Sequence, residues 1–173
     1  MIGNEPLILR ALEPSDVHAV LSVIGDCRKE YGLENRVPAI LEPSDHRLFD
    51  IYQRRRSAYF VALVNGDILG GAGIARLPDS DGSTCELQRM YLRRARRGLG
   101  IGHALLAQCL QAARRFQYER CYAETISTMG TAIAFYERHG FHRLRAPIGQ
   151  TGHHHNDCWM LLDLQAHGVN VGV

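Results

Sequence analysis

The 173-residue sequence contains no apolar run that approaches the roughly 18–20 residues of a transmembrane helix. Its first residues lack a basic segment followed by an apolar core, so we expect no signal peptide. There is no internal repeat, low-complexity linker or compositional break, which predicts a single domain over residues 1–173. The formal net charge of +2 does not by itself favour a nucleic-acid partner. We therefore expect a cytoplasmic globular protein that binds neither nucleic acid nor membrane.

The cysteines also lack a pattern, since they are odd in number, widely spaced and without a CxxC pair. We expect all of them to be reduced and mostly buried; they are Cys27, Cys85, Cys109, Cys121 and Cys158. The consecutive histidines 153–155 point in different directions in a loop, and no further residues at ligand spacing complete a tetrahedral set. We therefore expect no metal and interpret this loop as solvated or substrate-lining.

The apolar pattern predicts a mixed α/β fold. Alternation and turn signals predict strands over residues 6–12, 58–64, 68–75, 84–92, 118–124, 141–144 and 158–164. Helical spacing and start signals predict helices over 13–32, 42–56, from the glycine-rich turn to about 116, and over 126–137. Gly70, Gly71 and Gly73 lie within the third strand and indicate close packing there.

The most informative segment is the turn between the fourth strand and the third helix. Free N–H groups and the helix dipole favour an anion at a helix start, and glycines admit its close approach. Gly98, Gly100 and Gly102 supply that access. Four arginines around them suit a polyanionic ligand, and each of the first three is equally compatible with a solvated basic turn; they are Arg93, Arg94, Arg96 and Arg97.

Two common phosphate-binding motifs do not fit this turn. A P-loop needs Lys followed by Ser or Thr after its last glycine, whereas His103 and Ala104 follow here. The dinucleotide fingerprint G-x-G-x-x-G is absent, and it belongs after the first strand of a parallel sheet. Both alternatives are therefore excluded.

The chain instead resembles the GNAT acyltransferase superfamily over nearly its whole length. Residues 97–102, RGLGIG, match the family's Arg/Gln-x-x-Gly-x-Gly loop, and residues 134–141, AFYERHGF, match its Ala-x-Tyr-x-x-x-Gly-Phe element. The order of strands and helices is also that of the family. The resemblance implies a mostly antiparallel mixed sheet of about seven strands flanked by about four helices, with a V-shaped gap between strands four and five.

The resemblance also implies acetyl-CoA as co-substrate. A bulge in the fourth strand would let the backbone of Met90 and Leu92 pair with the pantetheine amides. Amides of the 97–103 turn would bind the pyrophosphate. The cofactor-binding residues expected on this basis are Met90, Tyr91, Leu92, Arg97, Gly98, Leu99, Gly100, Ile101, Gly102 and His103. Many relatives carry Asn where this chain has Met129, and Thr128 or Thr131 could replace its hydrogen bond.

Two catalytic residues follow from the family positions. Direct attack needs a neutral amine, so a base must accept its proton, and Glu86 stands where many relatives keep that base. By strand alternation, Gln88 and Met90 would share its face. Glu124 at the end of the fifth strand is a second candidate for the base. Tyr136 occupies the position of the acid that protonates the leaving thiolate.

The resemblance therefore implies an N-acetyltransferase that acts on a primary amine of an unidentified small molecule or peptide in a ternary complex. The alternative from another class is a non-catalytic acyl-CoA sensor or interaction module. Acceptor specificity is expected from the first two helices and from the loops at 78–83 and 146–156. The acidic residues Asp79, Asp81 and Glu86 hint at a cationic acceptor. Dimers are common among relatives, so a homodimer is compatible with this interpretation.

Overall fold

The computed structural model describes residues 6–33, 47–152 and 155–165. Its strands are β1 (Ile8–Ala11), β2 (Ala58–Val64), β3 (Asp67–Arg76), β4 (Thr84–Leu92), β5 (Arg120–Thr125), β6 (His142–Arg143) and β7 (Cys158–Asp163). Its α-helices are α1 (Val17–Glu30), α2 (Leu48–Tyr52), α3 (Ile101–Arg115) and α4 (Gly130–Arg138). Within these ranges, no helix is both long and apolar enough to span a lipid bilayer.

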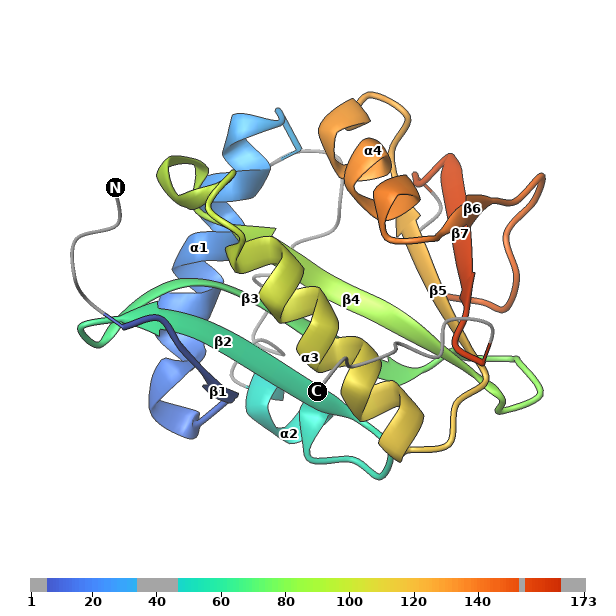
Figure 1. Ribbon diagram of the computed structural model, residues 1–173, viewed down its shortest axis with the longest axis horizontal. Coiled ribbons are helices and arrows are strands. Elements are labelled where there is room, and N and C mark those ends of the chain that lie inside the picture. Colours follow the sequence, from blue (N-terminus) through green and yellow to red (C-terminus); the bar gives the residue numbers. More distant parts are fainter. Residues whose placement is uncertain (1–5, 34–46, 153–154, 166–173) are drawn as a thin grey trace, which may run out of the picture.

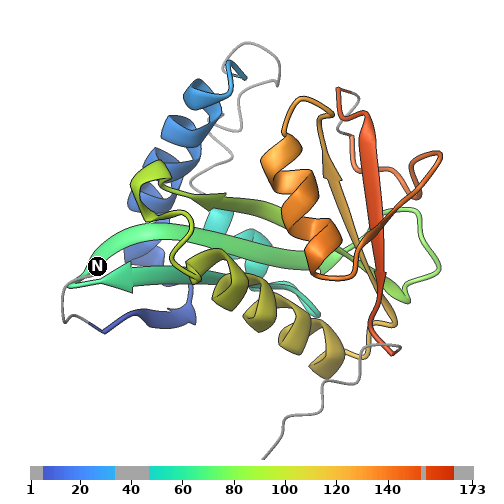
Figure 2. The same cartoon turned by 45° about the horizontal axis from the view of Figure 1, so that its top comes forward.

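The strands form one seven-stranded sheet in the order β1-β2-β3-β4-β5-β7-β6. Only β4 and β5 run parallel among the paired strands of the described chain. They pair from Thr84 to Leu87 and then separate, although β4 continues to Leu92 (Figure 2). The predicted fold class and the V-shaped gap between strands four and five are therefore confirmed.

The helices cover both faces of this sheet, with α1 and α2 on one face and α3 and α4 on the other (Figure 1). Two clusters of buried apolar side chains fill the layers between helices and sheet. β2 contributes to both by strict alternation: Tyr59, Val61 and Leu63 face α1 and α2, whereas Phe60, Ala62 and Val64 face the other side. A two-sided core of this kind holds β4 at the centre of the molecule.

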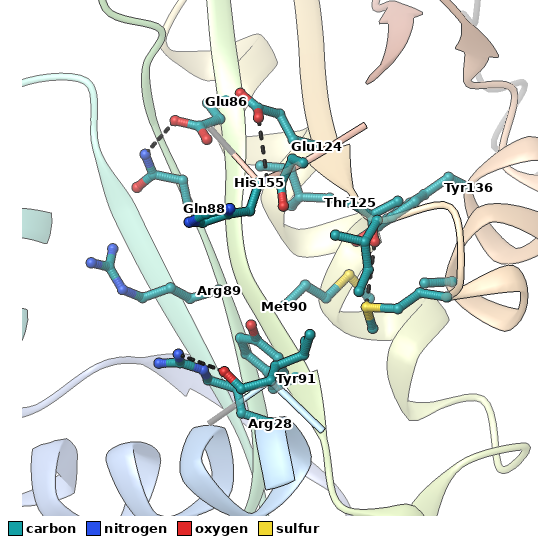
Figure 3. Close-up of a pocket in the computed structure, with 16 residues that line it drawn as sticks. Arg28, Glu86, Gln88, Arg89, Met90, Tyr91, Glu124, Thr125, Tyr136 and His155 are labelled. Atoms are coloured by element: carbon teal, nitrogen blue, oxygen red, sulfur yellow. Dashed lines mark hydrogen bonds between the residues drawn. The ribbon is translucent and has the colours of Figure 1, made fainter. Parts of the chain in front are cut away.

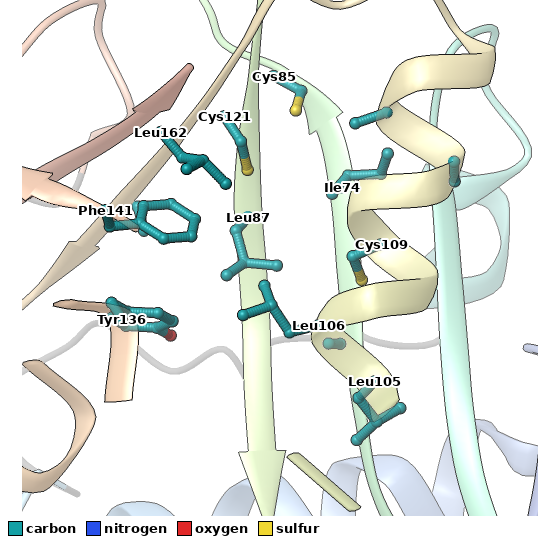
Figure 4. Packing of buried hydrophobic residues seen from close by; sticks show 14 of the residues in the cluster. Ile74, Cys85, Leu87, Leu105, Leu106, Cys109, Cys121, Tyr136, Phe141 and Leu162 are labelled. Atoms are coloured by element: carbon teal, nitrogen blue, oxygen red, sulfur yellow. The ribbon is translucent and has the colours of Figure 1, made fainter. Parts of the chain in front are cut away.

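The five cysteines are all buried and unpaired, as the sequence predicts. Cys85 and Cys121 occupy paired positions of β4 and β5, and Cys109 approaches them from α3 (Figure 4). Burial raises the pKa of the Cys109 thiol, which keeps it protonated. These thiols therefore behave as core residues rather than as nucleophiles.

Two of the glycines of β3, Gly71 and Gly73, are required by tyrosine rings that lie across the strand. A Cβ atom on Gly71 would lie 2.5 Å from Cε1 of Tyr59, and one on Gly73 would lie 2.6 Å from Cε1 of Tyr52. Both rings are buried, with their centroids 5.0 Å apart. The close packing predicted for this strand is confirmed, and it seats the tyrosines behind β4.

We predict that Gly71→Ala lowers the free energy of unfolding by about 1–3 kcal/mol, because the added methyl group overpacks a rigid ring. Gly25→Ala is the matched control. Gly25 lies within α1 and no atom lies within 4 Å of its added Cβ, so this change should leave stability unchanged or raise it by up to about 1 kcal/mol. Urea unfolding measures both changes, and equal stabilities of the two variants would contradict the packing argument.

The second helix is shorter than predicted. It ends at Tyr52, whereas the three arginines 54–56 were expected in its last turn. Arg56 has φ of 60°, and its guanidinium donates to the carbonyls of Phe116 and Gly82, both at 2.9 Å. Such tertiary bonds leave no pattern in the local sequence. The predicted start at 42–46 lies outside the described residues.

The fourth helix begins at Gly130 rather than at residue 126. Asp157 accepts bonds from the amide and the hydroxyl of Ser127 at 2.6 and 2.7 Å. These bonds hold residues 126–129 as a turn between β5 and α4, so the helix starts about one turn later.

Candidate active site

A bulge interrupts β4 at Arg89, which has φ of 48°. Gln88 pairs with Gly73 and Tyr91 with Gly71, so two residues of β4 oppose Ala72. The predicted bulge is confirmed. The extra residue also shifts the alternation of side chains, so Met90 packs with the cluster beneath α3 and not on the face of Glu86. The prediction that Glu86 and Met90 share a face is therefore wrong.

A groove of about 510 Å³ lies between β4, the glycine-rich turn and α4. Its lining includes most of the residues predicted to bind the cofactor: Met90, Tyr91, Leu92, Arg97, Gly98, Gly100, Gly102 and His103. Leu99 and Ile101 do not line it, since Leu99 is exposed and the Ile101 side chain is buried in the core. Tyr31, Arg138 and His139 also line it and were missed from the sequence.

The turn itself has the geometry of an anion site. Gly98 and Gly100 adopt φ of 76° and 81°, a region that favours glycine, and the space above both is open. The Ala104 amide donates to the Gly100 carbonyl at 3.0 Å and closes the first turn of α3. The amides that precede it have no intrahelical acceptor and are available to an anion.

Arg97 lines the groove and is at the same time bound to α1. Its two terminal nitrogens bind the Glu30 carboxylate at 2.7 and 2.8 Å, and its Nε donates to the Leu92 carbonyl at 3.0 Å. Cys27 Sγ also donates to that carbonyl at 3.3 Å. Arg97 thus holds the turn against α1. Because the Leu92 carbonyl already accepts these two hydrogen bonds, the predicted pairing of Leu92 with pantetheine would use its N–H group, and it stays a prediction.

The other arginines of the turn do not line the groove. Arg93 pairs with Asp26 at 3.0 Å on the surface, and Arg94 and Arg96 lie in a short 3₁₀-helix. At the opposite wall, His103 Nδ1 lies 2.8 Å from His139 Nε2, a contact that joins the start of α3 to the end of α4. Side-chain contacts of the cofactor are therefore expected from the α4 wall more than from these arginines.

A second cavity of about 510 Å³ is lined by residues of both β4 and β5 (Figure 3). Its lining combines both carboxylates proposed from the sequence with two arginines: Arg28, Leu33, Glu86, Leu87, Gln88, Arg89, Met90, Tyr91, Glu124, Thr125, Ile126, Met129, Ala132, Tyr136, His155 and Asn156. It shares Met90, Tyr91, Met129, Ala132 and Tyr136 with the groove. The two spaces thus meet at β4 and α4.

Glu86 has the properties of a base that works near neutral pH. It is only 3% exposed, and burial raises its pKa from 4.5 to about 7. Gln88 Nε2 donates to its carboxylate at 2.6 Å and opposes that rise, while the negative charge of Glu124 adds to it. A carboxyl group with this pKa both accepts and releases a proton at physiological pH.

A chain of hydrogen bonds extends from Glu86 behind β4. The Tyr52 hydroxyl donates to Gln88 Oε1 at 3.0 Å, and Arg89 Nη1 donates to that hydroxyl at 3.1 Å. Burial raises the pKa of Tyr52 to about 12, so it remains a phenol. Every donor in the chain points toward the carboxylate, and an aligned chain of this kind favours its charged form.

Glu124 lies across the gap from Glu86. Tyr122 pairs with Glu86, which places Glu124 two residues farther along β5, and Asn156 Nδ2 donates to Glu124 at 3.3 Å. His155 lines the same cavity, whereas His153 and His154 lie outside the described residues. Across the described part of the chain, no three His, Cys, Asp or Glu side chains are grouped to hold a metal ion.

Tyr136 lines both spaces from α4 and packs against Phe141, with ring centroids 5.4 Å apart. Burial raises the pKa of its hydroxyl, which therefore stays protonated. Met129 Sδ accepts a bond from Thr125 at 3.5 Å. Of the two threonines considered as replacements for the family's Asn, Thr131 lines the groove and Thr128 does not.

One predicted specificity segment lies away from the cavity. The loop at 78–83 does not contribute to its lining, and Asp81 pairs with Arg120 at 3.0 Å. The Gln150 amide donates to the Pro78 carbonyl at 3.1 Å, so the loop at 78–83 is hydrogen-bonded to the loop at 146–156. Of the three acidic residues that hinted at a cationic acceptor, Glu86 lines the cavity, whereas Asp79 and Asp81 do not.

The comparisons with known proteins agree with this geometry. Residues 26–141 match the family model described as "Acetyltransferase (GNAT) family". The Escherichia coli (strain K12) protein named "Uncharacterized N-acetyltransferase YjgM" is 35% identical over 164 residues, which cover 94% of this chain and 98% of that protein.

Solved structures share the fold. A GNAT-family acetyltransferase from Staphylococcus aureus Mu50 has a TM-score of 0.81 at 19% identity and covers 92% of this chain and 99% of its own. YncA from Salmonella typhimurium, solved with its cofactor acetyl-CoA, has a TM-score of 0.76 at 20% identity over 96% of this chain and 99% of its own. The family model and the identity with YjgM confirm the identification made from the two motifs: the chain belongs to the GNAT family of acetyltransferases.

Proposed function

We propose that the protein transfers the acetyl group of acetyl-CoA to a primary amine by direct attack in a ternary complex. The observation that supports this most is that the groove and the carboxylate-lined cavity share one wall, which includes Met90 and Tyr136. A thioester in the groove and an amine in the cavity would meet at that wall. YncA, which has the same fold, binds acetyl-CoA.

The proposed assignment of the donor site follows the lining of the groove. Amides at the start of α3 bind the pyrophosphate, and the β4 backbone from Met90 to Leu92 pairs with pantetheine across the gap left by β5. Arg97 lines the groove, and its ion pair with Glu30 positions the turn. Acetyl-CoA bound in this way presents its thioester to the second cavity.

The chemical step then uses the two predicted groups. Glu86 accepts a proton from the ammonium form of the acceptor, directly or through water, and the neutral amine attacks the thioester carbonyl carbon. The C–N bond forms, the tetrahedral intermediate collapses, and the C–S bond breaks. The nitrogen of the intermediate releases its second proton to water, and Tyr136 donates its hydroxyl proton to the departing thiolate and regains one from water, so that one proton is released overall.

Coenzyme A release in the presence of a panel of primary amines tests this function. We expect turnover with at least one class of small amine or peptide, and none when the acceptor is omitted. Tight binding of acetyl-CoA without turnover on any acceptor would contradict the proposal and favour an acyl-CoA sensor. Isothermal titration with acetyl-CoA measures that binding independently of catalysis.

A further inference from the structure

The charges along the acceptor cavity have an order that goes beyond the need for a base. Glu86 and Glu124 lie together at one end, and Arg89 and then Arg28 lie farther along β4 (Figure 3). One cavity therefore offers negative charge at one end and positive charge at the other.

Both arginines are fixed by the fold. Arg28 comes from the last turn of α1, is 5% exposed, and donates from Nη2 to the Leu33 carbonyl at 3.2 Å. Arg89 sits in the bulge, where its Nη1 donates to Tyr52 and its carbonyl accepts the Tyr59 hydroxyl. These contacts orient the two guanidinium groups beside the cavity.

Their positive fields reach the same part of the cavity wall. Burial raises the pKa of Tyr91, and the charges of Arg28 and Arg89 both oppose that rise. Arg89 likewise opposes the burial of charge at Glu86. The charge of Arg89 therefore acts both on Glu86 and on Tyr91, and the charge of Arg28 acts on Tyr91.

From this arrangement we infer that the acceptor is an amine that also carries an anionic group, as an amino acid does. The inference rests on the proposed acetyl transfer and specifies its substrate class. The ammonium group would lie toward Glu86 and Glu124, where it loses its proton. The carboxylate would meet Arg89, with Arg28 behind it, through charge-assisted hydrogen bonds.

The dimensions agree with a small zwitterion. Glu86 and Arg89 are three residues apart on β4, about 10 Å along an extended strand and less across a bulge. The amine nitrogen and carboxylate oxygen of an α-amino acid, with one hydrogen bond at each end, span about 9 Å. Leu33, Ile126, Met129 and Ala132 line the rest of the cavity and suit an apolar side chain.

The same charges disfavour other amines. A diamine would bring its second ammonium group toward Arg89 and Arg28, where like charges repel. An amino amide has the shape of the amino acid but lacks the anion. The comparison of acid and amide therefore isolates the contribution of the two arginines.

The test uses matched pairs of methionine with methioninamide and leucine with leucinamide, together with cadaverine. Coenzyme A release and calorimetric binding in the presence of coenzyme A are measured for each. We expect kcat/KM for the acid to exceed that for the amide by about 10–100-fold. The amine of the amide is less basic, so more of it is in the neutral, nucleophilic form at a given pH. Amine reactivity alone would therefore favour the amide, and a preference for the acid must come from recognition of its carboxylate.

Substitutions then connect the preference to the residues. Arg28→Gln and Arg89→Gln should each lower the acid-to-amide ratio of kcat/KM about tenfold or more, mainly through KM of the acid. Arg115→Gln, an exposed position in the last turn of α3, is the matched control and should leave the ratio unchanged. If Arg89→Gln does not fold, Arg28→Gln alone decides the matter.

The outcomes separate this inference from the proposed function. Turnover of amides or cadaverine at rates equal to or above those of the acids would overturn the inference and leave acetyl transfer intact. Binding of the acids, lost in Arg28→Gln, without coenzyme A release would support the inference and contradict the transfer. Absence of binding by every pair would overturn the inference, while the wider amine panel would still test acetyl transfer.

Discussion

Glu86→Gln is expected to lower kcat/KM by about 10²–10⁴-fold, the range usual for loss of a general base. Gln keeps the size of the side chain and can still accept the bond from Gln88, but it cannot take a proton. Steady-state coenzyme A release over pH 5.5–9 with a turned-over acceptor measures the effect.

The pH dependence of kcat/KM shows whether activity requires the ionised form of Glu86. The folded pKa of Glu86 is about 7, so its carboxylate form predominates above that value and its acid form below. In the wild-type protein, kcat/KM should fall about tenfold per unit as the pH drops below 7. That dependence should be absent from the residual activity of Glu86→Gln.

Glu124→Gln is the matched control, because Glu124 lines the same cavity but is held by Asn156. We expect a smaller loss, and an acid limb that moves to lower pH because a negative charge beside Glu86 has been removed. If Glu124→Gln abolished turnover while Glu86→Gln retained it, the base would be Glu124.

The loss of kcat/KM in Glu86→Gln should not result from unfolding of the variant. Between its ordinary pKa of 4.5 and its folded pKa of about 7, Glu86 keeps its proton in the folded state and loses it in the unfolded state. The contribution of this buried group to stability therefore falls as the pH rises through that window, by about 3 kcal/mol in total. Gln avoids this loss, so the variant should be as stable as the wild type at pH 8, or more so.

Tyr136→Phe is expected to lower kcat by about 10²-fold and to change KM for acetyl-CoA little. Tyr136 lines both spaces, and the raised pKa of its hydroxyl keeps that group protonated. An unperturbed thiol has a pKa of about 8.5, so the thiolate leaves without help more readily than an alkoxide would, which places the effect at the lower end of the usual range.

Tyr118→Phe is the control for loss of a buried phenol. Its hydroxyl donates to the Arg56 carbonyl at 2.9 Å, away from both spaces. This variant should lose some stability and keep its kcat. A Tyr136→Phe protein with wild-type kcat at every pH would show that the thiolate needs no proton from Tyr136.

The parts of the molecule that the sequence predicts are those with local signals. Short stretches of the sequence predict the bounds of β4, the glycine-rich turn and the Tyr136 element. The groove follows from them, since Gly98 and Gly100 need only their own backbone geometry to open it. Glu86 was proposed from the resemblance to the family, at a position six residues before Leu92 on the same strand, and its role as the base stays a prediction.

Features that depend on distant contacts escaped prediction. Simple alternation fails at the Arg89 bulge, which depends on the pairing of β4 with β3, and so Met90 was placed on the wrong face. Arg97 lines the groove, but its ion pair with Glu30 was not predicted, because Glu30 lies 67 positions earlier in the sequence and leaves no local pattern. Arg28 reads as an ordinary cation near a helix end, and only the packing of α1 brings it to the cavity.

The shared wall has a consequence for how this enzyme could diversify. A substitution at Met90 or Tyr136 alters the groove and the carboxylate-lined cavity together. Arg28, Gln88 and Asn156 line the carboxylate-lined cavity and not the groove, so under the proposed function they contact the acceptor alone. New acceptors are therefore most accessible through changes at those positions, where variation leaves the coenzyme site untouched.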